Sequence, residues 1–185
     1  PYSASIDEAG LAGGLAIANR AGQPVAASVT IRGVPQVAPP ASSDGYAVAR
    51  SYSTLEGQPA DSTKIGQGDR LVVVDEVTLV DRGPARLMLD DPLPAGFAID
   101  NPAILRAGDV ATLDWLQLSG DAAHTDFRTD RFLAAIDQGP DDTATHPFAH
   151  IPPAAAPAAF DPPPAVLANL YDPSRRAPTA AAPPP

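Results

Sequence analysis

The sequence predicts an all-β protein whose main body is an antiparallel β-sandwich of about eight to ten short strands. Three observations predict this class. Runs rich in β-branched residues are separated by clusters of turn residues along most of the chain. The clearest of these runs, Leu71–Val80, is bounded by turn residues on both sides. No stretch of about ten or more residues keeps a helical period.

The segment around Leu71–Val80 is expected to be an antiparallel hairpin. A turn at residues 66–69 starts the first strand, a second turn at residues 81–84 reverses it, and Arg86–Asp90 runs back. Two prolines within residues 92–94 then remove backbone donors, so the second strand is expected to end at a rigid corner.

The first part of the chain is expected to hold two further short strands joined by a turn. They are Leu15–Asn19 and Val25–Arg32, and the second alternates apolar residues with small or polar ones. Two strands alone are marginal in water, so this pair needs other sheet partners. A Pro/Ser-rich passage from Gly33 to Asp44 follows and is expected to be a linker.

The remaining strands are expected to be short, and the end of the chain is unusual in composition. Thirteen of the 23 prolines fall between Pro140 and Pro185, interleaved with alanine. Apolar residues are nevertheless spaced there as in packed segments, which predicts two poor edge strands and then a structureless tail over Ala177–Pro185. The other expected strands are Tyr46–Tyr52, Phe97–Asn101, Ala103–Arg106, Thr125–Asp130 and Arg131–Ile136.

Composition excludes several classes of function. The net charge of −10 would repel a phosphate backbone, which argues against nucleic acid as a partner. The absence of cysteine excludes disulfides, thiolate metal sites and a cysteine nucleophile within these residues. No apolar run of about 18 residues is present, so no membrane span is expected. The start at Pro1 indicates a chain that was processed or taken from a longer one.

Three groups of polar residues are candidate sites of catalysis or metal binding. His124 with Asp126 and Asp130 is the most enzyme-like group, because a histidine beside carboxylates suits a general base or part of a metal site. No nucleophile motif accompanies it, and the plainer interpretation is a polar loop whose aspartates are neutralised by Arg128 or Arg131.

The other polar groups are weaker candidates. His146 and His150 have helical ligand spacing, but Pro147 between them argues against a helix and therefore against a metal site. Two acidic pairs and one Asp-Asn pair offer calcium ligands without the 12-residue loop pattern, so solvated turn charge is the preferred interpretation. These pairs are Asp90-Asp91, Asp141-Asp142 and Asp100-Asn101.

Aromatic residues and glycines also favour structural interpretations. Four aromatic residues could form a ligand-binding face or pack in the core, and packing is the preferred interpretation. The glycines near residue 10 lack the lysine and the strand–helix context of a phosphate loop. No catalytic residue, metal ligand or cofactor site is therefore predicted. The aromatic residues are Trp115, Phe127, Phe132 and Tyr46.

Several stretches, taken together and in order, resemble the C-terminal portion of bacterial alpha-2-macroglobulins. The most specific is HTDFRTDRFLAA at His124–Ala135, which resembles the entry to a strand of the final macroglobulin domain. DPLPAGFAIDNP at Asp91–Pro102 resembles a corner of the same domain. The others are Leu15–Asn19 with Gln23–Pro35, Gln67–Val74, and Tyr171-Asp172-Pro173 with Arg175-Arg176. The Pro/Ala-rich residues 144–165 and 180–185 depart from the family pattern.

The resemblance implies a domain arrangement. Residues 1–38 would be the closing strands of a CUB-like module, 39–44 a linker, and 45–176 a macroglobulin or fibronectin-III-like β-sandwich. Residues 177–185 would be a Pro/Ala tail.

The resemblance also implies a function. Family members are large periplasmic protease traps in which cleavage of a bait region triggers a rearrangement, and some capture the protease through a Cys–Gln thioester. The final domain packs against the thioester domain and shields it.

This chain would be a non-catalytic latch within such a protein. Its partners would be the thioester domain, the CUB-like module and, through the whole protein, target proteases. Its location would be periplasmic or otherwise extracytoplasmic, with a membrane anchor of the parent left open. Phe127 and Tyr171, at strand ends, are the candidate interdomain contacts.

Two alternatives stay open at this stage. The first is a bacterial surface adhesin-type β-sandwich, because the D-x-L-P-A-G pattern also occurs in repeated surface domains. The second is a hydrolase that uses His124 and Asp126.

Overall fold

The computed structural model describes most of the chain and divides it into two compact units, residues 1–34 and 35–185. Each unit is considered by itself. The described residues are 4–32, 40–61, 64, 66–94, 96–98, 110, 113–118, 122–154 and 162–180.

The first unit contains one short helix, α1 (Glu8–Leu11), which begins after Asp7. Asp7 accepts a hydrogen bond from the backbone N of Gly10 at 2.9 Å, as an N-terminal capping residue does. The strands predicted at Leu15–Asn19 and Val25–Arg32 are not formed. No ladder pairs either segment within the described residues, and without a sheet their apolar side chains stay in solvent.

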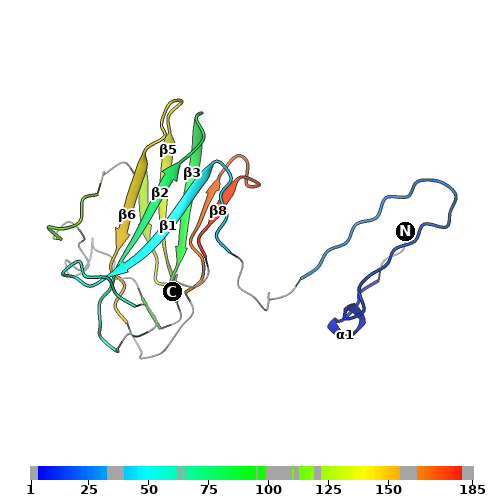
Figure 1. The fold of residues 1–185 in the computed structure, drawn as a ribbon, viewed down its shortest axis with the longest axis horizontal. Helices are drawn as coiled ribbons and strands as arrows, with labels where there is room; N and C mark the ends of the chain where they lie inside the picture. The colour runs from blue at the N-terminus through cyan, green and yellow to red at the C-terminus, as the bar shows by residue number, and fades with distance from the viewer. Residues whose placement is uncertain are drawn as a thin grey trace. The chain divides into compact units, whose positions relative to one another are not determined.

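The second unit is a sandwich of two antiparallel sheets (Figure 1), which confirms the predicted fold class. The smaller sheet has the strand order β1-β2-β6 and the larger sheet has the order β4-β5-β3-β7-β8. The smaller sheet consists of β1 (Tyr46–Ser53), β2 (Val72–Leu79) and β6 (Thr145–His150). The larger consists of β3 (Ala85–Pro92), β4 (His124–Phe127), β5 (Arg131–Gln138), β7 (Val166–Asn169) and β8 (Arg176–Pro178).

The hairpin predicted for residues 71–90 is wrong in its pairing, although both strands exist. β2 pairs with β1 and β6, whereas β3 pairs with β5 and β7, so the turn between β2 and β3 carries the chain from one sheet to the other. Burial explains this arrangement. Val77 and Leu79 pack across the sandwich against Leu87 and Leu89, and all four side chains are at most 1% exposed. β3 ends at Pro92, where a proline corner was expected.

The core lies between the sheets and is built from alternate positions of each strand. In β5 the inward residues Phe132, Ala134 and Ile136 are each 1% exposed, which is the period of two expected of a half-buried strand. Burying each large side chain of this kind contributes about 1.5–3 kcal/mol. A second cluster of apolar residues covers the other face of β2, including Val72 and Val74, with partly buried Leu113 and Leu116 packed on it.

The proline-rich end of the chain is more ordered than predicted. β6 is an edge strand, as expected, and tolerates Pro147 for that reason. β7 is not an edge strand, since it pairs with both β3 and β8. The predicted structureless tail is wrong for residues 177–180, because Ala177 is buried in β8 and Thr179 Oγ1 accepts a hydrogen bond from the Ala165 N at 2.9 Å.

Other predicted elements have mixed outcomes. The strand predicted at residues 103–106 and most of the one at 97–101 lie outside the described residues, as do residues 181–185. Trp115 is not buried as a core residue; it is 38% exposed. In the described part of the chain, α1 is too short to cross a bilayer and no other helix is long and apolar enough.

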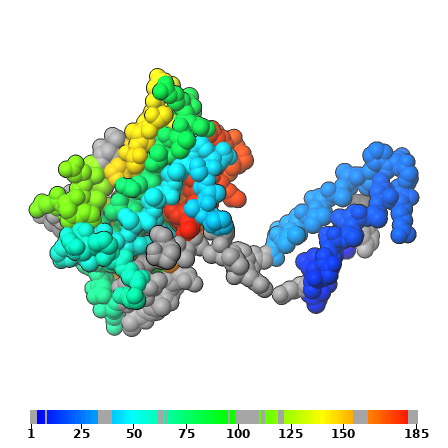
Figure 2. Space-filling model, viewed as in Figure 1, coloured from blue at the N-terminus to red at the C-terminus, as the bar shows by residue number. Residues whose placement is uncertain are grey.

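The two edges of the sandwich differ. On one side β1 lies against β7 and β8, which is visible where the cyan surface of β1 meets the red surface of the C-terminal strands (Figure 2). On the other side, described residues around β4, β5 and β6 line an apolar hollow of about 190 Å³. Its walls include Phe127, Phe132 and Phe148.

Candidate functional site

The most unusual interior feature is a group of polar side chains between the two sheets, which we call the inter-sheet cluster. Arg50 and Tyr52 come from β1, Asp75 from β2, Asp91 from β3 and His150 from β6. The side chains of Asp91 and His150 are at most 1% exposed, and that of Arg50 is 5% exposed. Charged groups are rarely buried so completely unless they are paired.

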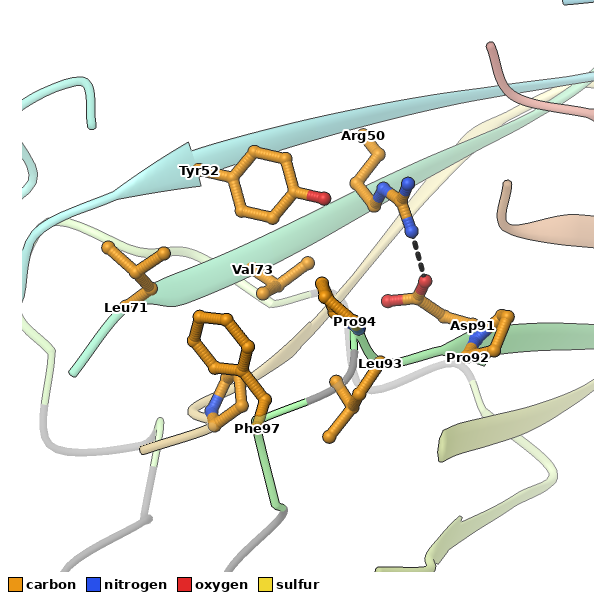
Figure 3. A pocket seen from close by; sticks show the side chains of 10 residues that line it. Arg50, Tyr52, Leu71, Val73, Asp91, Pro92, Leu93, Pro94 and Phe97 are labelled. Carbon is orange, nitrogen blue, oxygen red and sulfur yellow. Dashed lines mark hydrogen bonds and ion pairs between the residues drawn. The ribbon is translucent and has the colours of Figure 1, made fainter. Parts of the chain in front are cut away.

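Asp91 is the centre of the inter-sheet cluster. Its Oδ1 accepts a hydrogen bond from Arg50 Nη1 at 2.5 Å, and Figure 3 shows this ion pair from close by. Its Oδ2 lies 2.8 Å from His150 Nε2. Burial acts to raise the pKa of Asp91, but its hydrogen bond to His150 and the charge of Arg50 outweigh burial, so the pKa is lowered. Asp91 therefore stays ionised and ties the larger sheet to β1 and β6 of the smaller one.

Arg50 is held by further contacts. Its Nη2 donates a hydrogen bond to the Pro163 carbonyl at 2.7 Å, and its guanidinium lies 5.6 Å from the centre of the Tyr52 ring. The Tyr52 hydroxyl points toward it (Figure 3). Burial raises the pKa of Tyr52 to about 12. A small space of about 10 Å³ adjoins Arg50 and Asp91, about the least that holds one water.

Asp75 is the member without an ordinary partner. The residue is fully buried, and in the described structure neither carboxylate oxygen accepts a hydrogen bond from a donor. Burial and the charge of Asp91 raise its pKa well above the usual value. Asp75, Asp91 and His150 offer ligand atoms within 4.8 Å of one another, the spacing of a metal site.

The donor set of these three residues does not fit a resident metal ion. Arg50 already neutralises Asp91, so a divalent ion would leave excess positive charge in the core. His150 Nδ1 is buried without a hydrogen-bond partner among the described residues, whereas a ligating histidine normally donates its second N–H. We therefore assign no metal to the inter-sheet cluster.

A second feature lies at the surface, where residues 170–175 join β7 to β8; we call it the tip loop. Leu170 is 52% exposed and Tyr171 is 85% exposed. The loop is nevertheless fixed by hydrogen bonds. Asn169 Oδ1 accepts from the backbone N of Tyr171 at 3.0 Å and of Asp172 at 3.3 Å, and Leu170 N donates to the Arg86 carbonyl at 2.8 Å.

Arg175 anchors the far side of the tip loop to the sandwich. Its Nη2 donates to Asp81 Oδ2 at 2.6 Å, and its guanidinium lies 5.1 Å from the centre of the Tyr46 ring. Asn169 Nδ2 also donates to the Tyr46 hydroxyl at 3.3 Å. The tip loop thus presents two apolar side chains from a backbone that is already ordered, which lowers the entropic cost of docking.

The polar residues that the sequence placed in an enzyme-like group do not form a site. His124 is exposed at the start of β4, while Asp126 pairs with Arg128 and Asp130 pairs with Arg131, each at 3.0 Å. The arginines thus neutralise these aspartates as the plainer interpretation predicted. Arg131 also lowers the pKa of Asp130.

The histidine and aspartate pairs are likewise separated. His146 lies 3.2 Å from Asp142, whereas His150 lies in the inter-sheet cluster, so the two histidines have different partners. Asp90 pairs with Arg131 on the opposite face of β3 from Asp91. Asp141 pairs with Arg82 at the surface. Asp100 and Asn101 lie outside the described residues.

The predicted aromatic and contact residues have distinct positions. Tyr46 and Phe132 are buried in the core, as the packing interpretation predicted. Phe127 is partly buried, with its ring centre 5.2 Å from that of Phe132, and lines the apolar hollow. Trp115 donates from Nε1 to the Leu55 carbonyl at 2.9 Å and lies against Gly57.

Sequence reasoning did not assemble the inter-sheet cluster, although a signal for it was present. Arg50 shares its strand face with Tyr46 and Val48, and Asp91 shares its face with Leu87 and Leu89. A charged residue on an apolar face requires a buried partner. The pattern therefore indicates that partners exist, but not which residues they are.

Comparisons with known proteins agree with the geometry. A family model described as the bacterial alpha-2-macroglobulin MG10 domain matches residues 45–174. Alpha-2-macroglobulin of Xylella fastidiosa (strain 9a5c) is 31% identical over 179 residues, which are 93% of this chain and 11% of that protein. Alpha-2-macroglobulin of Escherichia coli (strain K12) is 25% identical over 175 residues, 90% of this chain and 10% of that protein. The chain thus spans about a tenth of the length of these relatives.

A solved structure extends the likeness to three dimensions. Escherichia coli alpha-2-macroglobulin activated by porcine elastase superposes with a TM-score of 0.67 at 26% identity, covering 82% of this chain and 14% of that one. These findings favour the macroglobulin interpretation over the adhesin one. Because the family match covers most of the sandwich, this chain belongs to the bacterial alpha-2-macroglobulin family, with its MG10 domain at residues 45–174.

Proposed function

We propose that this MG10 domain is a non-catalytic latch, which docks through its tip loop on the thioester domain of its parent protein and shields that domain until a protease triggers the parent. The observation that carries the proposal is the tip loop itself. Leu170 and Tyr171 are exposed, while the backbone beneath them is fixed through Asn169 and Arg175. An exposed apolar pair on an ordered loop suits a docking contact.

Several features support a structural rather than a catalytic role. The enzyme-like group around His124 is divided into separate ion pairs. Phe127 is a second proposed contact residue, because it lies at the end of β4 in the wall of the apolar hollow. Tyr171 is the stronger of the two, since most of its ring is free to meet a partner.

We also propose that residues 1–38 complete a CUB-like module of the parent. Val25, Val29 and Ile31 are 64%, 52% and 75% exposed, although their spacing suits one buried strand face. Strands contributed by the parent would cover that face and pair with these residues. The parent would act outside the cytoplasm, where proteases would be its targets.

The latch is tested by replacing Tyr171 with aspartate in the full-length parent. Desolvating the carboxylate would weaken docking, and interface tyrosines commonly contribute more than about 1 kcal/mol. We therefore expect thioester loss, measured by thiol release in methylamine, or susceptibility to added protease, to rise about fivefold or more. The circular dichroism spectrum should be unchanged, which would show that the MG10 domain is still folded.

Two control variants sharpen this test. Tyr171→Phe keeps the ring and should behave like the wild type. Leu55→Asp places the same charge at another exposed apolar residue, far from the tip loop in sequence, and should leave both readouts unchanged. If Tyr171→Asp changes neither readout, the assignment of Tyr171 to the docking surface is rejected.

A further inference from the structure

The inter-sheet cluster contains two carboxyl groups that cannot both be ionised without a cost that no neighbour offsets. A carboxylate oxygen of Asp75 lies within 4.8 Å of a carboxylate oxygen of Asp91, and both residues are at most 1% exposed. Two carboxylates offer only acceptors, so a hydrogen bond between them requires a proton. Like charges at this distance in a buried site are avoided by retaining one proton between the two groups.

The other groups that face Asp75 determine where this proton resides. β1 contributes Arg50 and Tyr52, β3 contributes Asp91, and β6 contributes His150. Arg50 is directly opposite Asp75 in the pairing of β1 with β2, but its guanidinium is bound to Asp91 and to the Pro163 carbonyl. It therefore pairs with Asp91, and its charge lowers the pKa of Asp75 by less than burial and the charge of Asp91 raise it.

His150 is the alternative location for the proton, and its surroundings argue against it. As a neutral ring, His150 donates from Nε2 to Asp91 Oδ2, and only an acceptor, Nδ1, is left without a partner. As a cation it would bury an unpaired N–H donor at Nδ1, which is rarer in proteins than an unpaired acceptor. Its ring also stacks on Phe132, with centres 5.0 Å apart.

Counting formal charge leads to the same result. Arg50 and Asp91 cancel, and His150 is neutral. An ionised Asp75 would leave one uncompensated negative charge in the core, whereas a protonated Asp75 leaves none. A protonated carboxyl can also donate a hydrogen bond to Asp91, which the ionised form cannot.

We propose that Asp75 is a buried proton-binding site, which holds its proton at neutral pH and donates it in a hydrogen bond to Asp91, so that the inter-sheet cluster is a proton-dependent clamp between the two sheets. Folding then takes up one proton near pH 7, because an aspartate in the unfolded chain ionises at about pH 3.9. This proposal does not depend on the latch.

The sign of the pH dependence follows from this uptake. Because the pKa of Asp75 is raised in the folded state, its contribution to the stability of the fold is fully present below the unfolded pKa. That contribution is lost as pH rises toward the folded pKa. Between the unfolded and the folded pKa of Asp75, the folding equilibrium constant falls by up to about tenfold per pH unit. Between pH 7 and 9 histidines are largely neutral in the unfolded chain, so Asp75 dominates the change.

The test compares the 185-residue chain with its Asp75→Asn variant in urea unfolding at several values between pH 5 and 9. The amide imitates the protonated acid and can donate to Asp91 at every pH. We expect the folding constant of the wild type to fall relative to that of Asp75→Asn by up to about tenfold per pH unit. Glu76→Gln, an exposed neighbour on β2, is the matched control and should keep the wild-type pH dependence.

A second measurement keeps the proposal falsifiable if Asp75→Asn does not fold. Calorimetric unfolding of the wild type at pH 8, in buffers of different ionisation enthalpy, should show net release of about one proton. Parallel pH profiles for the wild type and Asp75→Asn, or unfolding without proton release, would overturn the proposal.

Discussion

Residues 25–32 and strand β5 have the same alternation of side chains but opposite surroundings. In β5, Phe132, Ala134 and Ile136 are each 1% exposed. With the same period of two in the first unit, Val25, Val29 and Ile31 are 52–75% exposed. The difference lies in their neighbours. β5 pairs with β3 and β4 and is covered by the other sheet, whereas no ladder pairs residues 25–32 in the described chain.

This comparison separates two requirements for a strand. An alternating pattern determines which face of a strand will be apolar, but burial of that face also needs a second sheet and paired edges. The first unit satisfies the pattern, but its described residues include no sheet partner. Replacing the same residue type in both units therefore measures how much the sheet partners contribute to stability.

The largest difference in unfolding free energy is expected between the variants Asp91→Ala and Asp7→Ala. Removing Asp91 leaves Arg50 buried without its counter-ion, and breaking a buried pair in this way commonly costs about 3–5 kcal/mol. Asp7 caps the exposed helix α1, so its replacement should change the unfolding free energy of the sandwich by less than about 0.5 kcal/mol. Urea unfolding followed by circular dichroism measures both. Similar losses for the two variants would mean that the units do not differ as described.

Ile136→Ala and Ile31→Ala form the second matched pair. Ile136 is 1% exposed in the core, and truncation should destabilise the sandwich by about 2–5 kcal/mol through lost burial and a cavity. Ile31 is 75% exposed and should contribute less than about 0.5 kcal/mol to the same transition. In the full-length parent, a sheet partner for residues 25–32 would bury Ile31, so Ile31→Ala should be destabilising there.

The same distinction explains which parts of the fold were predictable. Strand positions follow from local alternation and turn residues, so β1, β2, β3 and β5 were placed nearly correctly. Pairing was not predictable in this way, because the short turn between β2 and β3 suited a hairpin. In the structure β2 instead lies between β1 and β6, and it is buried on both faces, with Val72 and Val74 on one and Val77 and Leu79 on the other.

The inter-sheet cluster was beyond local reasoning for a related reason. Asp91 is 41 residues from Arg50 and 59 from His150, so no spacing rule links them. The sequence drew attention to His150 through its distance from His146, and to Asp91 through its neighbour Asp90. Neither pair forms a site. Asp90 and Asp91 are adjacent and face opposite sides of the sheet, whereas His146 and His150 share a face of β6 but lie about 13 Å apart along the strand.

β8 was missed because its composition gives a weak signal. Its residues, Arg176-Ala177-Pro178, have little preference for strands. The segment is ordered by pairing with β7 and by the hydrogen bond from the Ala165 N to Thr179. Tertiary contacts, which the sequence does not display, thus override local preference.

The smallest effects are expected at two glycines that have similar backbone angles, Gly57 (φ 81°) and Gly22 (φ 74°). Alanine at either position costs about 1–2 kcal/mol locally, because a side chain disfavours positive φ. At Gly57 the new Cβ would also lie 2.8 Å from Cδ2 of Trp115, so the indole must move and weaken its hydrogen bond to the Leu55 carbonyl. At Gly22 a Cβ meets nothing within 4 Å.

Gly57→Ala should therefore destabilise the sandwich by about 1–2 kcal/mol and shift the emission of Trp115, the one tryptophan of the chain, to longer wavelength. Gly22→Ala should alter neither the emission nor the unfolding midpoint, because its strain is confined to the first unit, whose described residues form no buried core. An unchanged spectrum for Gly57→Ala would show that the indole does not rest on this turn in solution. A lowered midpoint for Gly22→Ala would show that the first unit unfolds together with the sandwich, and the contrast between the two units would then be one of exposure and not of stability.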